Sequence, residues 1–564
     1  MRLQILNFKG AVPRMHPRLL PENFGQTASN TRLEDGSLGP IRAPRAEYTF
    51  GAAVQTIYRD GATWLGWNAV VDVAPAPVAA SRLYYTGDGA PKVRDSGTVY
   101  GLALTAPAAA PTLTALSTPD PAAQETVLYC YTFITSLGEE SAPSPLASVT
   151  WSPGVTIRLS AFSAAPGSRA VTGRRIYRSQ TSAAGITSLY FVAEIAFPAT
   201  YDHDLAAAPL QEPLPTIDFD TPSAGLIGLT AMPNGMMAAF EGKEVFFSEP
   251  YQPHAWPSKY ALAVDYPIVG LSAFGSILAI LTTGTPYIAQ GTHPESMVLE
   301  KMDRSLPCLS RRAIVDIGYA CYFPSTDGLA VLSATDAQIV TRNLFTREQW
   351  QLMSPATFVA NAYDGRYLFT FTSDVFDALD GLAPDGVGLP ADYLDGGAPS
   401  GGAVSLSYDF GSPTSAFGSQ RLGSIDIAGE LPFFIDADVI LPATMFADRG
   451  SGELFMLEGT TVVKEWDDPA GTPATQTWRS KVFQLPFPTN FGAALVETDA
   501  PIGAGDAFAC HVFADGLLVD TITTVNEPVR LTSGYLAKRW EVEIVTNIAV
   551  SGVTVASTMD EVAG

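Results

Sequence analysis

Hydrophobic and polar residues alternate over short runs along most of this chain, and the runs end at Gly, Asp, Asn or Pro. Such alternation places side chains on the two faces of an extended strand, whereas a helix repeats its apolar positions every three to four residues. Helical periodicity is nearly absent from the sequence. The pattern therefore predicts an all-β protein built from many short strands that are joined by tight turns.

Four segments in the middle of the chain have the form strand, turn, strand: 236–250, 277–288, 319–332 and 358–371. Their predicted turns lie at Gly242–Lys243, near Gly284, at Asp327–Gly328 and at Asp364–Gly365. The turns recur at intervals of about 40 residues, the length of one four-stranded blade of a β-propeller. Neither the WD40 nor the kelch signature is present, so we expect an irregular β-propeller, with a large β-sandwich or barrel as the alternative.

A second kind of domain is predicted after a linker rich in Ala, Pro and Thr, residues 105–125. Residues 126–134, with the sequence TVLYCYTFI, are mostly β-branched or aromatic, and further strands are predicted around 155–159, 174–178 and 190–195. Strands at this spacing are typical of a small immunoglobulin or fibronectin-like β-sandwich. We expect this sandwich to be inserted into the larger domain, which resumes near Pro213.

The length of 564 residues is too great for one hydrophobic core, because single domains usually stop growing at about 250–300 residues. The predicted division has an N-terminal segment with the first propeller strands (1–105) and the inserted sandwich (106–215). The main propeller blades follow (216–410), and then the closing blades with additional C-terminal β structure (411–564).

The charge balance limits the partners that the chain can have. Asp and Glu number 57 against 33 Lys and Arg, which gives a formal net charge of −24, and charged residues make up only 16% of the chain. A basic groove for nucleic acid is not expected, because phosphate binding needs clustered Lys and Arg. An acidic passage could still conduct DNA, since its walls would repel the phosphate backbone and prevent sticking.

Signals for a cellular compartment are few. The four cysteines, Cys130, Cys308, Cys321 and Cys510, show neither a CxxC pair nor metal-ligand spacing, so we expect four buried thiols and no disulfide framework. The first ten residues, MRLQILNFKG, contain too short an apolar stretch for a signal peptide. No run of about 18 apolar residues is present, so no membrane span is predicted. Synthesis in the cytoplasm is expected.

The sequence contains no recognisable catalytic motif. P-loop, GxSxG, HExxH and paired CxxC patterns are absent, and no catalytic residue, cofactor or metal ligand is predicted. His254 could act as a base only with a carboxylate in reach, for which Glu249 is the local candidate, and a structural histidine in a packed turn is the favoured interpretation. Glu139 and Glu140 would point to opposite faces of a strand, so they do not form the carboxylate pair of a glycosidase. The protein is predicted not to be an enzyme.

Residues 374–400 form a long polar segment with many glycines and six aspartates. A loop of this length inside a compact domain either moves freely or holds a partner. Hard cations need clustered carboxylates, so a calcium site is the alternative. The spacing misses the DxDxDG pattern, which favours the loop without calcium.

Basic residues are few, and local groups of arginines occur within 174–178 and at 311–312. A nucleic-acid surface would need a broader stripe with interleaved aromatic residues. Arginine suits ion pairs and subunit contacts instead, because its planar fork pairs with the carboxylates that this chain has in excess. The predicted interface residues are Arg174, Arg175, Arg178, His254, Trp256, Arg311 and Arg312.

Several stretches resemble one family of phage and prophage virion proteins, the tail nozzle or tail tubular protein B type. The longest has the sequence FSEPYQPHAWP and covers Phe247–Pro257. The others include Phe8–Gly10, Pro13-Arg14, Leu19–Pro21, Gly36–Pro40, Tyr131–Phe133, Gly138–Pro145, Arg175–Arg178, Cys308–Arg312, Ser325–Leu329 and, more loosely, Trp478–Lys481. The resemblance covers most of the chain up to about residue 350.

The resemblance implies a structural protein of a short-tailed bacteriophage, located in the virion tail. Such a subunit contains a propeller and forms a ring, expected to be a hexamer, below the head-to-tail adaptor. The ring would conduct and gate double-stranded DNA during ejection and would anchor fibres or spikes, with no sequence-specific DNA binding. This chain is shorter than the best-known nozzles, so the resemblance assigns neither a distal gate nor the fibre-docking parts.

Two other functions remain open from the sequence. A receptor-binding or glycan-degrading virion protein on the same propeller would need a cleft with convergent aromatic residues and two carboxylates near the propeller centre. A tail adaptor or hub would also be structural and would differ only in its position in the particle. The sequence does not separate the nozzle from the hub.

Overall fold

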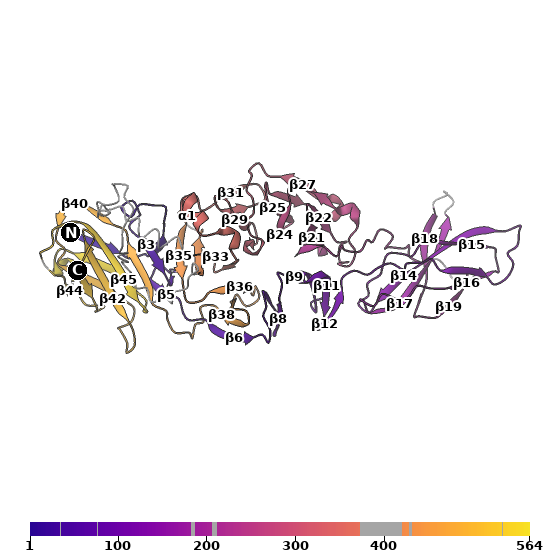
Figure 1. Ribbon diagram of the computed structural model, residues 1–564, viewed down its shortest axis with the longest axis horizontal. Helices are drawn as coiled ribbons and strands as arrows, with labels where there is room; N and C mark the ends of the chain where they lie inside the picture. Colours follow the sequence, from indigo (N-terminus) through magenta and orange to yellow (C-terminus); the bar gives the residue numbers. More distant parts are fainter. Residues whose placement is uncertain are drawn as a thin grey trace, which may run out of the picture. The chain divides into compact units, whose positions relative to one another are not determined.

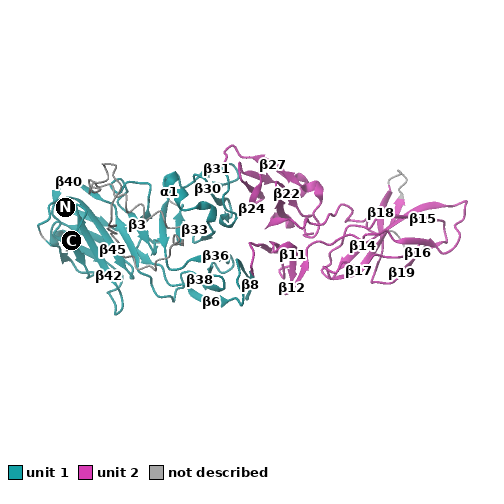
Figure 2. Ribbon diagram, viewed as in Figure 1, with its two compact units in different colours: residues 1–66, 306–564 teal, residues 67–305 magenta. Residues whose placement is uncertain are grey.

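The computed structural model describes residues 1–33, 35–75, 77–181, 187–205, 211–372, 420–427, 431–532 and 534–563 (Figure 1). These residues form a mostly β protein with few helices. The α-helices among them are α1 (Arg347–Leu352) and α3 (Met559–Ala563). The chain divides into two compact units, unit 1 with residues 1–66 and 306–564 and unit 2 with residues 67–305 (Figure 2). The predicted domain boundaries at 105, 215 and 410 stay predictions.

Unit 1 contains an eleven-stranded sheet that joins the two ends of the chain. Its strands are, in spatial order, β32 (Ala360–Tyr363), β33 (Arg366–Thr372), β34 (Gln420–Asp426), β35 (Phe433–Ala437), β2 (Lys9–Ala11), β3 (Phe24–Ser29), β39 (Gln476–Ser480), β45 (Ala537–Thr546), β42 (Phe508–Ala514) and β43 (Leu517–Ile522), with β40 (Phe483–Thr489) beside β45. Strand β35 pairs with β2 at Ala11 and Phe434 and with β3 at Ser29 and Asp436, and these two pairs attach the four-stranded meander of β32 to β35 to the rest of the sheet. One large core of buried aromatic residues, including Phe8, Phe369 and Trp478, lies on this sheet.

Three smaller four-stranded antiparallel sheets complete unit 1. One is a meander of consecutive strands, β28 (Val315–Asp316), β29 (Cys321–Ser325), β30 (Gly328–Leu332) and β31 (Ala337–Ile339). In another, β36 (Pro442–Ala447), β37 (Leu454–Glu458) and β38 (Val462–Glu465) are joined by the N-terminal strand β6 (Arg45–Thr49). The third sheet contains, in spatial order, β1 (Arg2–Ile5), β46 (Gly552–Ala556), β41 (Ala493–Glu497) and β44 (Val529–Arg530). Two-stranded sheets are formed by β4 (Thr31–Arg32) with β5 (Gly39–Pro40) and by β7 (Thr56–Asp60) with β8 (Thr63–Trp67).

Unit 2 has three four-stranded antiparallel sheets of the same meander form, each made of consecutive strands. The first has β9 (Asp72–Pro75), β10 (Arg82–Gly87), β11 (Gly89–Asp95) and β12 (Thr98–Gly101). The second has β20 (Ile227–Ala231), β21 (Met237–Glu241), β22 (Glu244–Phe247) and β23 (Leu262–Ala263). The third has β24 (Ile268–Phe274), β25 (Ile277–Thr282), β26 (Tyr287–Gln290) and β27 (Val298–Lys301).

Between β12 and β20 the chain forms a two-sheet body, here called the sandwich. One sheet contains, in spatial order, β13 (Thr112–Ala115), β16 (Thr156–Ser160) and β19 (Thr200–Asp204). The other contains β15 (Ala147–Trp151), β14 (Glu125–Thr135), β17 (Val171–Thr181) and β18 (Thr187–Ile195), also in spatial order. Alternate residues of β14 and β16, among them Tyr129, Tyr131 and Ile157, are fully buried in one core between the sheets. This is the packing that period-two patterning produces when both sheets have one apolar face.

The structure confirms the four predicted hairpins, since β21–β22, β25–β26, β29–β30 and β32–β33 all pair antiparallel. Three belong to separate four-stranded sheets, whereas β32–β33 belongs to the eleven-stranded sheet. The expected linker at 105–125 is wrong in part, because β13 lies within it and pairs with β16. All four cysteines are buried and free, as predicted.

Candidate functional site

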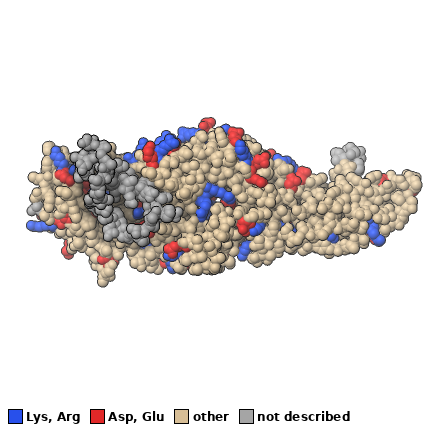
Figure 3. Space-filling model, viewed as in Figure 1, with Lys and Arg blue, Asp and Glu red and all other residues tan. Residues whose placement is uncertain are grey.

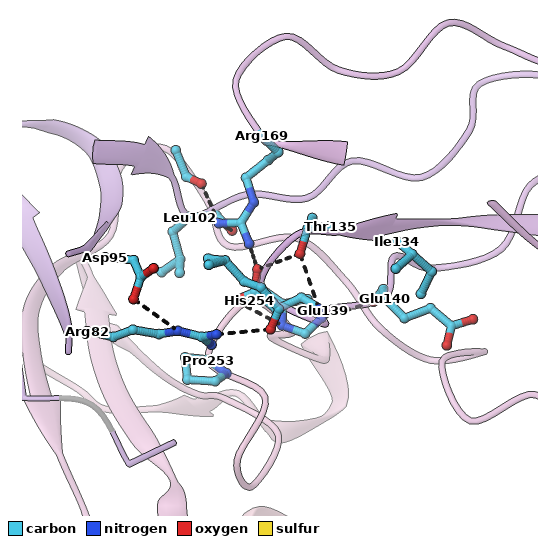
Figure 4. Close-up of polar contacts among 12 residues, drawn as sticks. Arg82, Asp95, Leu102, Ile134, Thr135, Glu139, Glu140, Arg169, Pro253 and His254 are labelled. Carbon is cyan, nitrogen blue, oxygen red and sulfur yellow. Dashed lines mark hydrogen bonds and ion pairs between the residues drawn. The ribbon is translucent and has the colours of Figure 1, made fainter. Parts of the chain in front are cut away.

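A group of buried charged residues lies where the sandwich meets the four-stranded sheets of unit 2. We call it the sandwich joint and define it as Arg82, Glu139, Glu140, Arg169 and His254 (Figure 4). Arg82 begins β10, the two glutamates follow the end of β14, Arg169 precedes β17, and His254 lies in the loop after β22. Four segments from a long stretch of chain therefore supply this one site.

The loop that carries His254 is held by its own hydrogen bonds. Glu249 N donates to Ala255 O at 2.9 Å, Ala255 N donates to Gln252 O at 2.9 Å, and the indole Nε1 of Trp256 donates to Pro253 O at 2.8 Å. Trp256 is only 3% exposed and packs in the core with Tyr84 and Leu229. This local closure explains why the side chain of His254 is fixed in place and points to the sandwich.

Glu139 and Arg169 form an ion pair inside the joint, with side chains exposed by 5% and 1%. The guanidinium also donates from Nη1 to Gly101 O at 2.7 Å. A buried ion pair is tolerated only when such extra hydrogen bonds offset the loss of water. Burial lowers the pKa of Arg169 to about 10, and the group stays charged at neutral pH.

His254 is neutral in this site. Burial lowers its pKa to about 4, and the neighbouring charges of Arg169 and Arg82 act in the same direction. Its Nε2 lies 2.9 Å from Glu140 O, which can only accept, so Nε2 carries the proton. The unprotonated Nδ1 then faces Oε1 of Glu139 at 3.9 Å, and two acceptors do not form a hydrogen bond.

The histidine is therefore not arranged as a general base. Glu249, the local candidate for its partner, accepts instead from the hydroxyl of Tyr260 at 2.8 Å.

No group of three or more His, Cys, Asp or Glu residues suited to a metal ion occurs within the described part of the chain. The predicted calcium alternative at 374–400 lies outside the described residues. What the joint provides is a rigid attachment, because its bonds connect backbone and side chains of separate sheets.

The other two members connect the joint to the sheets on either side. Arg82 Nη2 donates to Leu137 O at 3.0 Å, and its Nε lies 3.7 Å from Oδ1 of Asp95. Glu140 points into the sandwich and accepts from Thr132 Oγ1 at 2.7 Å and from Tyr177 Oη at 2.6 Å. Burial and then this bond raise the pKa of Tyr177. The two adjacent glutamates thus point in different directions, as their spacing predicts.

The structure gives the predicted interface residues partners within their own chain. The Arg174 guanidinium lies between the rings of Phe162 and Phe197, 4.9 and 4.7 Å from their centroids. Arg175 pairs with Glu140 at 3.1 Å and Glu194 at 3.0 Å. Arg178 is half-buried on β17, opposite Tyr129 and Tyr190.

Glu140 links two of these predicted residues, since its carboxylate pairs with Arg175 and its carbonyl bonds to His254. Arg311 and Arg312 belong to unit 1, where burial lowers the pKa of each and Arg312 Nη2 donates to Ala443 O at 2.8 Å. A subunit-contact role for the seven residues stays a prediction. Sequence reasoning missed Arg82 and Arg169, which are single arginines without any motif around them.

A second buried contact joins the beginning and the end of the chain in unit 1. The rings of Phe8 and Trp478 meet edge to face with centroids 4.9 Å apart, and Trp478 Nε1 donates to Lys9 O at 2.8 Å. Strand β3 pairs with β39 beside this contact, with Ala28 opposite Trp478. Residues 8–9 and 478 are thus neighbours although most of the sequence separates them.

Comparison with known proteins gives little information about this chain. No protein-family model matches the sequence, and no curated protein matches it. Among solved structures, the N-terminal domain of Nup159 is 8% identical, with a TM-score of 0.22, over 54% of this chain and 67% of its own. PorZ of Porphyromonas gingivalis is 12% identical, with a TM-score of 0.22, over 82% of this chain and 52% of its own. The extracellular domain of BT4673 from B. thetaiotaomicron is 7% identical, with a TM-score of 0.19, over 92% of this chain and 78% of its own.

These are distant matches to β-propeller proteins, and they carry no information about what this chain binds or does. The chain spans about half the length of PorZ, at 52%. Within the described residues, no helix is both long and apolar enough to span a membrane. The residues themselves must therefore carry any argument about function.

Proposed function

We propose that this chain is a structural tail nozzle protein of a short-tailed bacteriophage. In this proposal six copies form a ring below the head-to-tail adaptor, conduct and gate DNA during ejection, and anchor fibres. The four-stranded sheets are blades of an irregular β-propeller, and the sandwich is an immunoglobulin or fibronectin-like insertion. The chain acts without catalytic residues or a cofactor and is located in the virion.

The proposal rests on the positions, in the fold, of the stretches that resemble nozzle proteins. Gly138–Pro145 and Phe247–Pro257 meet in the sandwich joint, where His254 bonds to Glu140. Phe8–Gly10 and Trp478–Lys481 meet in the contact of Phe8 with Trp478. Sequence stretches with no catalytic group thus coincide with buried contacts that hold the fold, which is the expected place for the signatures of a structural family.

Two further features agree with the propeller form. Meanders of four consecutive antiparallel strands recur in both units, which is the form of a propeller blade. In unit 1, β6 from near the N-terminus completes the sheet of β36 to β38 from the late part of the chain. A strand taken from the opposite end of the chain is a way to close a ring of blades without leaving a free edge.

The charge suits a passage for DNA. A net charge of −24 for each copy would surround DNA with like charge, and repulsion from all sides opposes adhesion. The low charged fraction of 16% leaves uncharged surface for broad subunit contacts, whose centres are depleted of charge. A passage lined with Lys and Arg would contradict the proposal.

The test is electron microscopy of phage particles made without this gene, with the wild-type gene supplied in trans as the control. We expect heads that leak DNA and lack the distal tail stump, because the chain lies on the sealing and ejection path. Complete, filled particles that fail to adsorb or to digest surface glycan would contradict the nozzle and favour a receptor-binding protein. Particles that lose the whole tail, adaptor included, would favour the hub.

A further inference from the structure

Unit 1 has a basic surface that the proposed function does not use. Its members are the exposed or half-buried residues Arg14, Arg18, Arg342, Arg347 and Lys481, and we call it the basic face. In Figure 3 blue Lys and Arg side chains gather near the positions of α1 and β31 in Figure 1. In a chain with 57 acidic residues against 33 basic ones, five basic residues on one surface are a local reversal of charge.

Hydrogen bonds hold the members of this face together. Arg14 N donates to Leu344 O at 3.0 Å and its Nη1 to Arg342 O at 2.6 Å, so the N-terminal turn lies on the segment before α1. Val482 N donates to Pro17 O at 3.1 Å, which brings Lys481 beside Arg18. The face is thus built from three segments of one compact unit.

The positive charge of the face is only partly balanced from within. Arg347 pairs with Asp327 at 3.1 Å, and Glu348 is the other nearby acid, since the charges of Arg347 and Arg14 help to lower its pKa. Arg18, Arg342 and Lys481 form no ion pair with any described residue. Leu19, which follows Arg18, and Leu352, the last residue of α1, are 74% and 51% exposed. Arginines beside exposed leucines are a combination enriched in protein interfaces.

The composition of the face favours a protein partner. Single-stranded nucleic acid is bound by a basic groove with stacking aromatic residues, and duplex DNA needs a longer row of phosphate contacts. The basic face has interleaved acids and leucines instead, on a chain of net charge −24 that repels phosphate at a distance. Arginine pairs well with carboxylates through its planar fork, so the fitting partner is an acidic protein surface.

The same unit offers such a surface. Residues 497–527 include Glu497, Asp499, Asp506, Asp515, Asp520 and Glu527 and contain no Lys or Arg, and we call this stretch the acidic segment. Asn526 Nδ2 donates to Thr498 Oγ1 at 3.0 Å, which brings Asp499 and Glu527, both exposed, to one place. Within unit 1, β42 of the acidic segment and α1 of the basic face are far apart (Figure 2). Each copy therefore presents two complementary surfaces at separate places.

We propose that the basic face of one copy binds the acidic segment of a second copy of this chain. The inference rests on the proposed function, because a contact between two different surfaces of identical copies repeats head to tail and forms a ring when the rotation closes. The opposite charges set the register of neighbouring copies, and the exposed leucines supply the apolar contact. The net repulsion between like-charged copies is offset locally at this contact.

Two charge-reversal variants of the full chain test the contact. Variant A carries Arg18→Glu and Arg342→Glu, and variant B carries Asp499→Lys and Glu527→Lys. The control carries Lys92→Glu and Arg94→Glu on β11 in unit 2, which changes the net charge as much as variant A does. Arg14 is left unchanged, because its bonds to Arg342 O and Phe345 O hold the backbone.

Association is measured by sedimentation velocity over a range of protein concentrations, and circular dichroism checks that each variant is folded. We expect A alone and B alone to associate at least about tenfold more weakly than the wild type, the equivalent of about 1.4 kcal/mol. An equimolar mixture of A and B should associate again, because each altered surface then meets an oppositely charged one. The control should associate like the wild type.

Three results would overturn the inference: wild-type association by A alone, a mixture of A and B that stays apart, or a wild-type chain that never associates. Duplex DNA that binds the wild type but not variant A at physiological salt would make the face a nucleic-acid surface, which also overturns it. Failure here is distinguishable from failure of the nozzle proposal. Unchanged assembly of A and B together with the expected loss of the tail stump in gene-deleted particles would reject only this contact.

Discussion

Glu139 and Arg169 carry the highest cost of burial in the sandwich joint, because both are almost fully removed from water. Their pairing offsets that cost only while both partners are present. Two hydrogen bonds also attach these segments to the first four-stranded sheet of unit 2. Arg82 of β10 donates to Leu137 O in the loop of Glu139, and Arg169 donates to Gly101 O of β12. At the scale of single residues, the attachment of the sandwich therefore depends on a few non-local bonds.

Replacing Arg169 by Met should destabilise unit 2 by about 3–5 kcal/mol, because the carboxylate of Glu139 stays buried without its partner. The free energy of unfolding, measured by urea titration of the full chain with tryptophan fluorescence, reports this loss. The matched control is Arg158→Met, which removes an ion pair with Asp202 whose side chains are 44% and 41% exposed, and which should change little. Equal effects of the two changes would contradict the assigned role of Arg169.

The stability of unit 2 should rise with pH between about 4 and 6.5 because of His254. Burial lowers its folded pKa to about 4, whereas the unfolded histidine titrates near 6.5, so the unfolded state binds more protons in this range. The contribution is present above the unfolded pKa and is lost as the pH falls toward the folded pKa, by up to about 3 kcal/mol. His203, whose pKa burial also lowers to about 4, acts in the same direction.

His254→Gln is the variant that isolates this effect, since the glutamine amide can still donate to Glu140 O but does not titrate. The slope of the free energy of unfolding against pH from 5 to 7 should be smaller in this variant than in the wild type. His511→Gln, at a half-exposed position on β42, is the control and should leave the slope of unit 2 unchanged. An unchanged slope in His254→Gln would show that this histidine is not buried neutral.

The sequence indicated a structural role for some residues of the sandwich joint and gave no sign of the others. The PHAWP segment predicted a structural histidine in a packed turn, because two prolines and a tryptophan restrict the loop. The only carboxylate that the sequence offered nearby was Glu249, whereas the contacts of His254 come from Glu139 and Glu140, more than 100 positions away. Non-local pairing of single charged residues leaves no periodic or spacing signal in one sequence.

Hairpins are the elements for which local chemistry decides the outcome. Gly242 at φ +62° and Gly365 at φ +71° occupy tight turns that L-residues adopt only with strain, so their positions predicted the turns correctly. Their strands pair within a few residues, and no distant information is needed. The pairing of β3 with β39 and of β6 with β38 is different, because strands from opposite ends of the chain meet, and nothing local specifies this.

Two glycines at the second four-stranded sheet of unit 2 should differ in their tolerance of alanine. At Gly242 a methyl group would meet nothing within 4 Å, so Gly242→Ala should cost only the strain of a positive φ, about 1–2 kcal/mol. At Gly228, with φ +73°, it would lie 2.3 Å from Cε1 of the buried Phe240. Gly228→Ala should cost about 1–3 kcal/mol more, since Phe240 must move in a filled core. Urea unfolding of both variants measures the difference, and equal costs would contradict this packing.

At the scale of the whole molecule, the chain crosses twice between its two compact units, near residues 66 and 306. Unit 1 has its large core around Phe8, Trp478 and Phe434, and unit 2 has separate cores in the sandwich and in the four-stranded sheets. Composition correctly indicated more than one core, because 564 residues exceed what one core supports. The limits of the two units near residues 66 and 306 leave no local signal in the sequence, because unit 1 is assembled from both ends of the chain.

Separate cores predict separate thermal transitions, because cooperative unfolding extends only as far as the contacts of one core. Differential scanning calorimetry of the full chain should therefore show two transitions, and Arg169→Met should lower only the one that belongs to unit 2. For a unit of this size, a loss of a few kcal/mol corresponds to a decrease in Tm of about 10 °C. Gly423→Ala is the complementary change in unit 1, because a methyl group on β34 would lie 2.7 Å from Phe434 Cε2 and 2.9 Å from Phe369 Cζ, and it should lower only the other transition. A single transition that both variants shift together would mean that the two units fold as one cooperative body.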